Sequence, residues 1–173
     1  IAEGRVIVGV GSYELAFEKP TYTFKGSVVS LDPTTGAVQW RTFTTNDDST
    51  GGAGASVWST AAIDTARKLL YIGVGQSYEE PAGPLTDSLI ALDYETGELI
   101  WHRQFTDGDV YRIFKTPING PDADVGAAPN LFTIGGRDVV GVGDKAGVYS
   151  VLDRTTGETV WARQLTVGSH LGG

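Results

Sequence analysis

A ten-residue pattern occurs three times in this chain and constrains the fold more than any other feature. The pattern is Leu-Asp, two residues, Thr-Gly, three residues, Trp, and it occupies residues 31–40, 92–101 and 152–161. The tryptophans that end the three copies are 61 and 60 residues apart. Five fixed positions recurring at a constant spacing indicate an array of similar structural units, in which most repeated residues build the framework.

Each copy of the pattern predicts a β-hairpin. In the second copy, an apolar run at 88–92 leads into the turn-forming segment 93–97, and another apolar run follows at 98–105. Two strands joined by a short loop that contains Gly are typical of a hairpin. Two further strand-like runs precede this hairpin, at 57–63 and 69–75.

The other two repeats follow the same order of strand-like runs. The third repeat has four runs, at 125–132, 137–143, 148–152 and 158–165, and the first has three, at 5–11, 27–31 and 37–43. No segment shows the sustained 3.6-residue apolar periodicity of a helix, so the chain is predicted to be all-β.

Four antiparallel strands per repeat of about 40–60 residues are typical of a β-propeller blade. We therefore predict a single partial propeller over 1–173, with an incomplete blade at 1–43 and whole blades at 57–105 and 124–166. A β-sandwich or a solenoid is the alternative. Propellers have about 4–8 blades, so we expect part of a longer propeller, or a chain that associates with further blades or a second chain.

Composition excludes several classes of function. The net charge of −8 argues against a nucleic-acid partner and against anionic membranes. The chain has no Cys, which excludes disulfides, Cys-ligated zinc and a Cys-x-x-Cys-His haem attachment. Its apolar runs are only strand-length, so no membrane span is expected. Three connections are long for a propeller and are expected near one rim or at the blade edges: 12–25, 44–56 and 106–124.

The repeat resembles that of the pyrroloquinoline-quinone (PQQ) dehydrogenases, a family of eight-bladed propellers. The segments 24–32, 120–129 and 143–149 resemble the polyvinyl-alcohol-dehydrogenase-like branch of that family. The resemblance implies PQQ and calcium as cofactors, a small or polymeric alcohol as substrate, and a periplasmic or secreted location. The same blades also occur in non-catalytic propellers, such as outer-membrane assembly scaffolds.

The resemblance also assigns roles to four residues. Trp58 would form the floor on which the flat quinone stacks, and Lys145 would hydrogen-bond the quinone oxygens. Gln76 stands where the family commonly has a calcium-ligating Asn and offers the same amide oxygen. Glu14 lies near the family's calcium-ligating Glu, with Glu18 as an alternative. Core packing for Trp58 and solvated side chains for the other residues are the structural alternatives.

The catalytic base stays open among Asp109, Asp122 and Asp124. In the family, an Asp shortly after a Trp takes the proton of the alcohol, but here the corresponding stretch reads Asp109-Val110-Tyr111-Arg112. An Arg side chain cannot act as a base at neutral pH. The adjacent-cysteine ring of many relatives is also missing, with 20–23 in that region.

Two functions from different classes are therefore expected. The first is a PQQ-dependent alcohol dehydrogenase, whole or in part, that transfers hydride from an alcohol to a calcium-bound quinone. The second is a non-catalytic propeller that binds a protein or a polysaccharide through its loops. A structural fragment without activity of its own is a third, weaker alternative.

Overall fold

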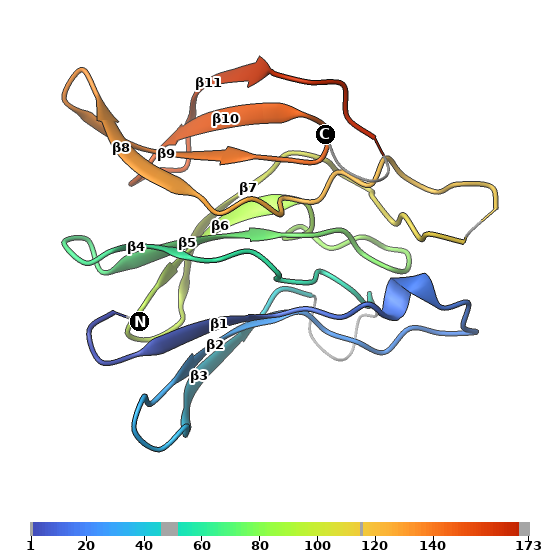
Figure 1. The fold of residues 1–173 in the computed structure, drawn as a ribbon, viewed down its shortest axis with the longest axis horizontal. Helices are drawn as coiled ribbons and strands as arrows, with labels where there is room; N and C mark the ends of the chain where they lie inside the picture. Colours follow the sequence, from blue (N-terminus) through green and yellow to red (C-terminus); the bar gives the residue numbers. More distant parts are fainter. Residues whose placement is uncertain (1, 46–51, 115, 170–173) are drawn as a thin grey trace.

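The computed structural model describes residues 2–45, 52–114 and 116–169, and it contains three antiparallel sheets stacked as layers (Figure 1). The first sheet comprises β1 (Val6–Val10), β2 (Ser27–Leu31) and β3 (Val38–Phe43). The second comprises β4 (Ala62–Asp64), β5 (Leu69–Val74), β6 (Ser88–Asp93) and β7 (Leu99–Gln104). The third comprises β8 (Asn130–Ile134), β9 (Arg137–Gly143), β10 (Val148–Asp153) and β11 (Thr159–Gln164).

The prediction of an all-β chain with antiparallel sheets is confirmed, and the first sheet has one strand fewer, as expected. The only helical turn among the described residues is η1 (Glu14–Ala16). Within each sheet, strands that follow one another in the sequence are also neighbours in space.

Two strands begin later than the apolar runs indicate. The runs at 57–63 and 125–132 become strands only at Ala62 and Asn130. Ahead of those points the backbone bonds to the preceding sheet instead, because Val57 N donates to Val10 O at 3.1 Å and Val125 N donates to Val74 O at 3.3 Å. These segments therefore connect neighbouring sheets.

The repeated Asp and Thr build the hairpin turns. Asp93 Oδ1 accepts hydrogen bonds from Glu95 N at 2.8 Å and Thr96 N at 2.9 Å, and Thr96 Oγ1 then accepts from Glu98 N at 3.2 Å. The other two copies repeat these bonds, and a register shift recurs at the same place in each hairpin. The side-chain bonds satisfy backbone groups that a sharp turn leaves without partners.

The repeated Trp docks on the repeated Gly of the next sheet. Trp40 Nε1 donates to Tyr94 O at 3.1 Å, and a Cβ atom on Gly97 would lie 2.6 Å from the Trp40 ring. Trp101 repeats the contact, with Nε1 donating to Arg154 O at 3.3 Å and its ring 2.7 Å from a Cβ atom on Gly157. The motif therefore joins sheets as well as forming hairpins.

Apolar side chains and one ionic network fill the space between the sheets. β5 and β6 are buried almost throughout and supply residues to both main core clusters. Between the second and third sheets, Arg154 donates to Asp64 Oδ2 at 3.0 Å. Arg67 pairs with the same Asp64 oxygen at 2.9 Å and with Asp138 at 2.6 Å.

The long connections gather at one end of the sheets, on the right in Figure 1. Short backbone bridges join Lys25 to Gly54 and Gly54 to Ser77, so loops from the first two sheets are bonded together. Part of the predicted 44–56 connection lies outside the described residues. Over the described ranges, no helix has the length and apolar character needed to cross a membrane.

Gly97 and Gly36 give a matched test of the Trp–Gly contact in this chain. Both have positive φ, at 78° and 72°, but a Cβ on Gly36 meets no described heavy atom within 4 Å. Gly97→Ala should therefore destabilise the chain by about 1–3 kcal/mol more than Gly36→Ala, because only the former overpacks a contact. Urea unfolding curves measure the difference, and equal losses would show that the docking contact is not needed.

Candidate functional site

A pocket of about 620 Å³ opens among the loops that gather at one end of the sheets. Side chains from all three repeats line it, because the Trp–Gly contacts bring the corresponding ends of the sheets together. Five of the seven residues singled out from the sequence contribute to the lining: Trp58, Gln76, Asp122, Asp124 and Lys145.

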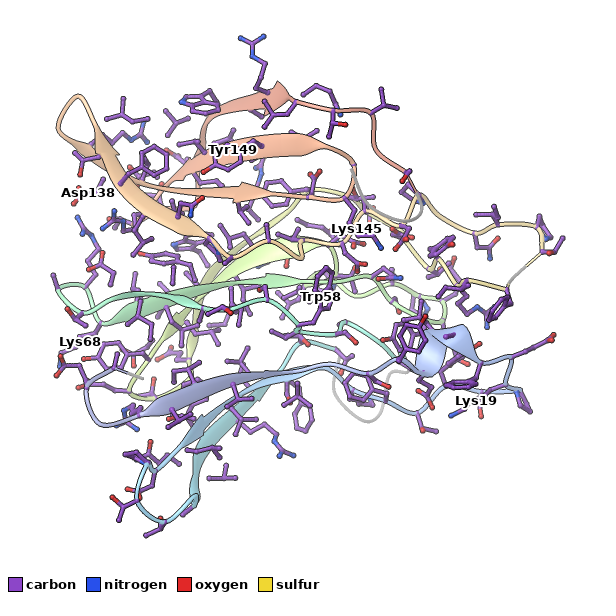
Figure 2. All side chains as sticks on the ribbon, viewed as in Figure 1. Lys19, Trp58, Lys68, Asp138, Lys145 and Tyr149 are labelled. Atoms are coloured by element: carbon purple, nitrogen blue, oxygen red, sulfur yellow. The ribbon has the colours of Figure 1, made fainter. Side chains whose placement is uncertain are left out.

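Trp58 presents a broad aromatic surface to the pocket. It is 55% exposed, a large fraction for an indole, and one edge of its ring lies so close to Gly126 that any Cβ there would overlap it. Figure 2 shows Trp58 between the first and second layers, with Lys145 further up toward the third. Trp58 is therefore not a core residue, and its ring suits the stacking of a flat, conjugated ligand.

Lys145 joins two buried carboxylates at the inner side of the pocket. Its Nζ lies 2.6 Å from Asp122 Oδ1 and 3.0 Å from Asp124 Oδ2. Burial alone would lower the pKa of Lys145, but the two carboxylates outweigh burial and the pKa is raised. The ammonium group therefore stays charged, and it is not the solvated turn residue of the structural alternative.

Asp122 and Asp124 form a coupled pair around that ammonium group. Burial raises the pKa of Asp122 to about 6, and the nearby Asp124 adds to the shift while Lys145 opposes it. Asp122 also has a left-handed backbone, with φ of 61°, which is uncommon for a residue other than Gly. With its pKa raised to about 6, Asp122 is suited to taking up a proton at neutral pH.

The Gln76 side-chain amide is surrounded by oxygen atoms. Its backbone N donates to Asp124 Oδ1 at 2.8 Å, and its Nε2 lies 3.3 Å from Asp122 Oδ1 and 3.4 Å from Tyr111 O. Its Oε1 then faces the carboxylate of Asp124, and the swapped orientation only moves Nε2 to that side. Amide and carboxylate oxygens of this kind are the ligands that a hard cation such as calcium prefers.

Glu14 does not join this set of oxygen atoms. Its carboxylate pairs with Lys19 and accepts hydrogen bonds from Phe24 N at 2.9 Å and Thr23 N at 3.1 Å. Burial alone would raise the pKa of Glu14, but these partners outweigh burial and lower it. Among the described residues, no group of three His, Cys, Asp or Glu side chains is arranged to hold a metal. A calcium ion here would therefore rely on the oxygens around Gln76.

Asp109 has a structural role behind the pocket. It is fully buried, does not contribute to the pocket lining, and accepts hydrogen bonds from Tyr111 N at 2.9 Å and Ala123 N at 2.8 Å. Burial raises its pKa, while those two backbone bonds oppose the shift. Asp109 therefore holds the 109–124 connection in place, and this leaves Asp122 and Asp124 as the acids that reach the pocket.

Two important residues had no sequence signal. Tyr78 is fully buried in the pocket wall, where its hydroxyl bonds Ser56 Oγ at 2.6 Å and Ser12 O at 2.9 Å. Asp87 is also fully buried, and neither carboxylate oxygen has a hydrogen-bond partner within the described ranges. Burial raises the pKa of Asp87 to about 9, and the nearby carboxylates of Asp109 and Asp124 add to the shift.

Comparison with known proteins gives a consistent result over the whole chain. The family model for PQQ, the glucose/ethanol/alcohol dehydrogenase beta-propeller domain, matches residues 4–165. A polyvinylalcohol dehydrogenase of Pseudomonas sp. is 34% identical over 195 residues, which cover 99% of this chain and 30% of that protein. The quinohemoprotein alcohol dehydrogenase ADH IIB of Pseudomonas putida is 28% identical, with 95% and 26% covered.

Solved structures agree with the sequence comparison. The quinohemoprotein alcohol dehydrogenase ADHIIG from Pseudomonas putida HK5 superposes with a TM-score of 0.75 and is 26% identical, covering 96% of this chain and 27% of that one. The quinohemoprotein alcohol dehydrogenase from Comamonas testosteroni has the same fold, with a TM-score of 0.74 at 24% identity. The chain spans less than a third of the length of these relatives.

Asp87→Asn should change how stability depends on pH. The folded protein keeps the Asp87 proton up to about pH 9, whereas the unfolded chain releases it near pH 4, so this group makes unfolding easier as the pH rises between those values. From pH 5 to pH 8 the wild type should therefore lose more stability than the variant, by at most about 1.4 kcal/mol per pH unit. Urea unfolding at the two pH values measures this, and parallel losses would contradict a protonated Asp87.

Proposed function

Because the chain belongs to the PQQ β-propeller family of glucose, ethanol and alcohol dehydrogenases, we propose that it forms part of a PQQ-dependent alcohol dehydrogenase. One observation carries the proposal: an exposed indole, a partly buried ammonium group and two neighbouring carboxylates line the same pocket. The flat ring, the cation and the base have complementary roles in oxidising an alcohol. The activity belongs to the longer protein, since this chain spans less than a third of its relatives.

The pocket residues divide the work of holding the cofactors. Trp58 would stack on the flat ring system of PQQ, and Lys145 would donate hydrogen bonds to its oxygens and balance negative charge that develops there. Gln76 would offer its amide oxygen to calcium, and Asp124 would stay beside Lys145 as part of the proton acceptor. When bound, PQQ supplies a two-electron acceptor that takes a hydride from the carbon bearing the hydroxyl group.

The Asp122–Asp124 pair would take the hydroxyl proton as the alcohol becomes a carbonyl compound. Both residues line the pocket, and Lys145 contacts both, so loss of one positive or negative charge changes the proton affinity of the pair. The substrate is an alcohol, small or polymeric, and similarity to polyvinylalcohol dehydrogenases supports the polymeric class.

Cofactor binding tests the roles of Trp58 and Lys145. In the full-length protein with excess calcium, Trp58→Ala should weaken PQQ binding about tenfold and Lys145→Met about 10–100-fold, as expected for a lost stacking surface and a lost charged hydrogen bond. Calorimetric titration measures both constants. Lys68→Met is the matched control, because Lys68 pairs with Glu95 at the opposite end of the sheets and should leave affinity unchanged (Figure 2). Unchanged affinity in Lys145→Met would contradict its role.

The rate of alcohol-dependent dye reduction tests the carboxylate pair. Below about pH 6 Asp122 is protonated and cannot accept a proton, so kcat/KM should fall about tenfold per pH unit there. Asp124→Asn should lower kcat at least about 100-fold, and the acid limb of any residual activity should move to lower pH because Asp122 loses its acidic neighbour. Asp107→Asn, an exposed residue of the same connection, is the control. A wild-type profile that is flat from pH 5 to 8 would exclude the pair as base.

The alternative function is a non-catalytic propeller that binds a protein or a polysaccharide. One observation favours it: the loop backbone and Lys19 already satisfy the Glu14 carboxylate, so it lies outside the candidate calcium ligands. One set of measurements distinguishes the two functions. Full-length protein that binds neither PQQ nor calcium and reduces no dye with any alcohol would support the alternative.

Association with further blades is part of the proposal. Trp161 is half-exposed and packs on Tyr149 of its own sheet, with ring centroids 6.1 Å apart. Gly36 has open space where its counterpart Gly97 receives a Trp from the preceding sheet. These two surfaces would receive the neighbouring blades of a longer propeller or of a second chain.

A further inference from the structure

A second pocket lies beside the one that contains Trp58 and Lys145. We call it the outer pocket; its volume is about 370 Å³. It lies between the connection that follows β1 and the connection that follows β7. Its lining comprises Leu15, Phe17, Glu18, Lys19, Tyr22, Arg112, Phe114 and Thr116.

One stretch of chain forms a wall common to both pockets. Tyr111 and Ile113 line the Trp58 pocket, whereas Arg112 and Phe114, which alternate with them, line the outer pocket. Leu15 lines both. The two pockets are therefore neighbours on the same loop end of the molecule. In Figure 2, Lys19 marks the outer side and Lys145 the inner side of this region.

An aromatic pair forms a second part of that wall. The ring of Tyr22, in the outer pocket, meets the ring of Tyr78, in the Trp58 pocket, edge to face at 5.9 Å. Hydrogen bonds fix both rings, because Tyr22 OH donates to Phe17 O at 2.7 Å and Tyr78 OH bonds Ser56. The ring contact and the hydrogen bonds therefore hold this part of the wall in place between the two pockets.

The outer pocket combines apolar surface with a guanidinium group. Phe17 and Phe114, which line it, are 61% and 68% exposed, large fractions for aromatic side chains. Arg112 also lines the pocket, and its guanidinium group lies over the Tyr22 ring at 5.1 Å. Such a pocket suits a ligand with apolar carbons and an oxygen acceptor.

The charges of the pocket favour a neutral ligand. Lys19 is neutralised by its ion pair with Glu14. Of the remaining lining residues that the structure describes, Arg112 and Glu18 carry opposite charges, so the charges of these described side chains balance. A hydroxylated carbon chain meets all of these conditions, because its carbons pack on aromatic rings while its oxygens accept hydrogen bonds.

We propose that the outer pocket binds the distal part of a long, neutral polyhydroxylated alcohol whose reacting hydroxyl group lies in the Trp58 pocket. The proposal rests on the proposed function, since the Trp58 pocket supplies the reaction. It adds a second binding site and two specificity-determining residues, Arg112 and Phe114. Neither residue lines the Trp58 pocket, so the chemistry of short alcohols does not depend on them.

Chain-length dependence in the full-length protein with PQQ and calcium tests the proposal. Arg112→Gln and Phe114→Ala should each lower kcat/KM for a polyvinyl alcohol oligomer about tenfold, and leave kcat/KM for 2-propanol unchanged. Ile118→Ala is the matched control, because this exposed apolar residue of the same connection does not line the outer pocket. Equal losses on both substrates, or no loss on the oligomer, would overturn the proposal.

A binding measurement separates this proposal from the proposed function. Calorimetric titration of the same oligomer into the protein without PQQ should give a dissociation constant that rises about tenfold in Arg112→Gln. That result would support binding at the outer pocket even if the protein oxidised no alcohol. A protein that oxidises no alcohol would contradict only the proposed function. Unchanged affinity in the variant, or tighter binding of an oligomer that carries carboxylates, would overturn the proposal for the outer pocket.

Discussion

The contact between the indole of one repeat and the Gly of the next is the interaction on which this structure depends. Trp40 on Gly97 and Trp101 on Gly157 fix how far apart neighbouring sheets lie and which ends of their strands coincide. The absence of a Cβ atom lets the large ring approach the turn of the next hairpin. A ring that docks and donates one hydrogen bond defines both distance and direction, and a purely apolar contact would define only distance.

The pocket is a consequence of that alignment. Gln76 follows β5, Lys145 follows β9 and Gly11 follows β1, so equivalent ends of three sheets supply one site, and Trp58 joins it from the segment before β4. Bringing the loops together also buries Asp87, Asp109 and Asp122 close to one another, which raises the pKa of each. Burying these carboxyl groups lowers the stability of the folded protein at this end of the molecule. Such a cost is common where a fold buries ionisable groups that take part in a reaction.

The sequence alone predicted the sheets because the pattern that forms each hairpin is local. Asp93 and Thr96 satisfy the backbone of their own turn, so the turn can be recognised without knowing the rest of the fold. The starts of β4 and β8 were misjudged for the opposite reason. Val57 and Val125 are strand-like, but their backbone amides bond to the preceding sheet.

The residues of the site also differ in how far their positions follow from the local sequence. Gln76 and Lys145 lie just after strands whose position follows from the repeat, and they line one pocket with Trp58. Glu14 lies in a long connection, where a neighbouring Lys and two backbone amides decide where its carboxylate points. Asp87 belongs to no motif, and its pKa is raised first by its own burial and then by the nearby acids, neither of which the sequence shows.

A crystal structure of the full-length protein with PQQ and calcium would decide whether this pocket receives a quinone between Trp58 and Lys145. We expect the PQQ ring system to stack on the Trp58 indole and Lys145 Nζ to lie within hydrogen-bond distance of a quinone oxygen. PQQ bound elsewhere, or bound here with Lys145 contacting only Asp122 and Asp124, would contradict it.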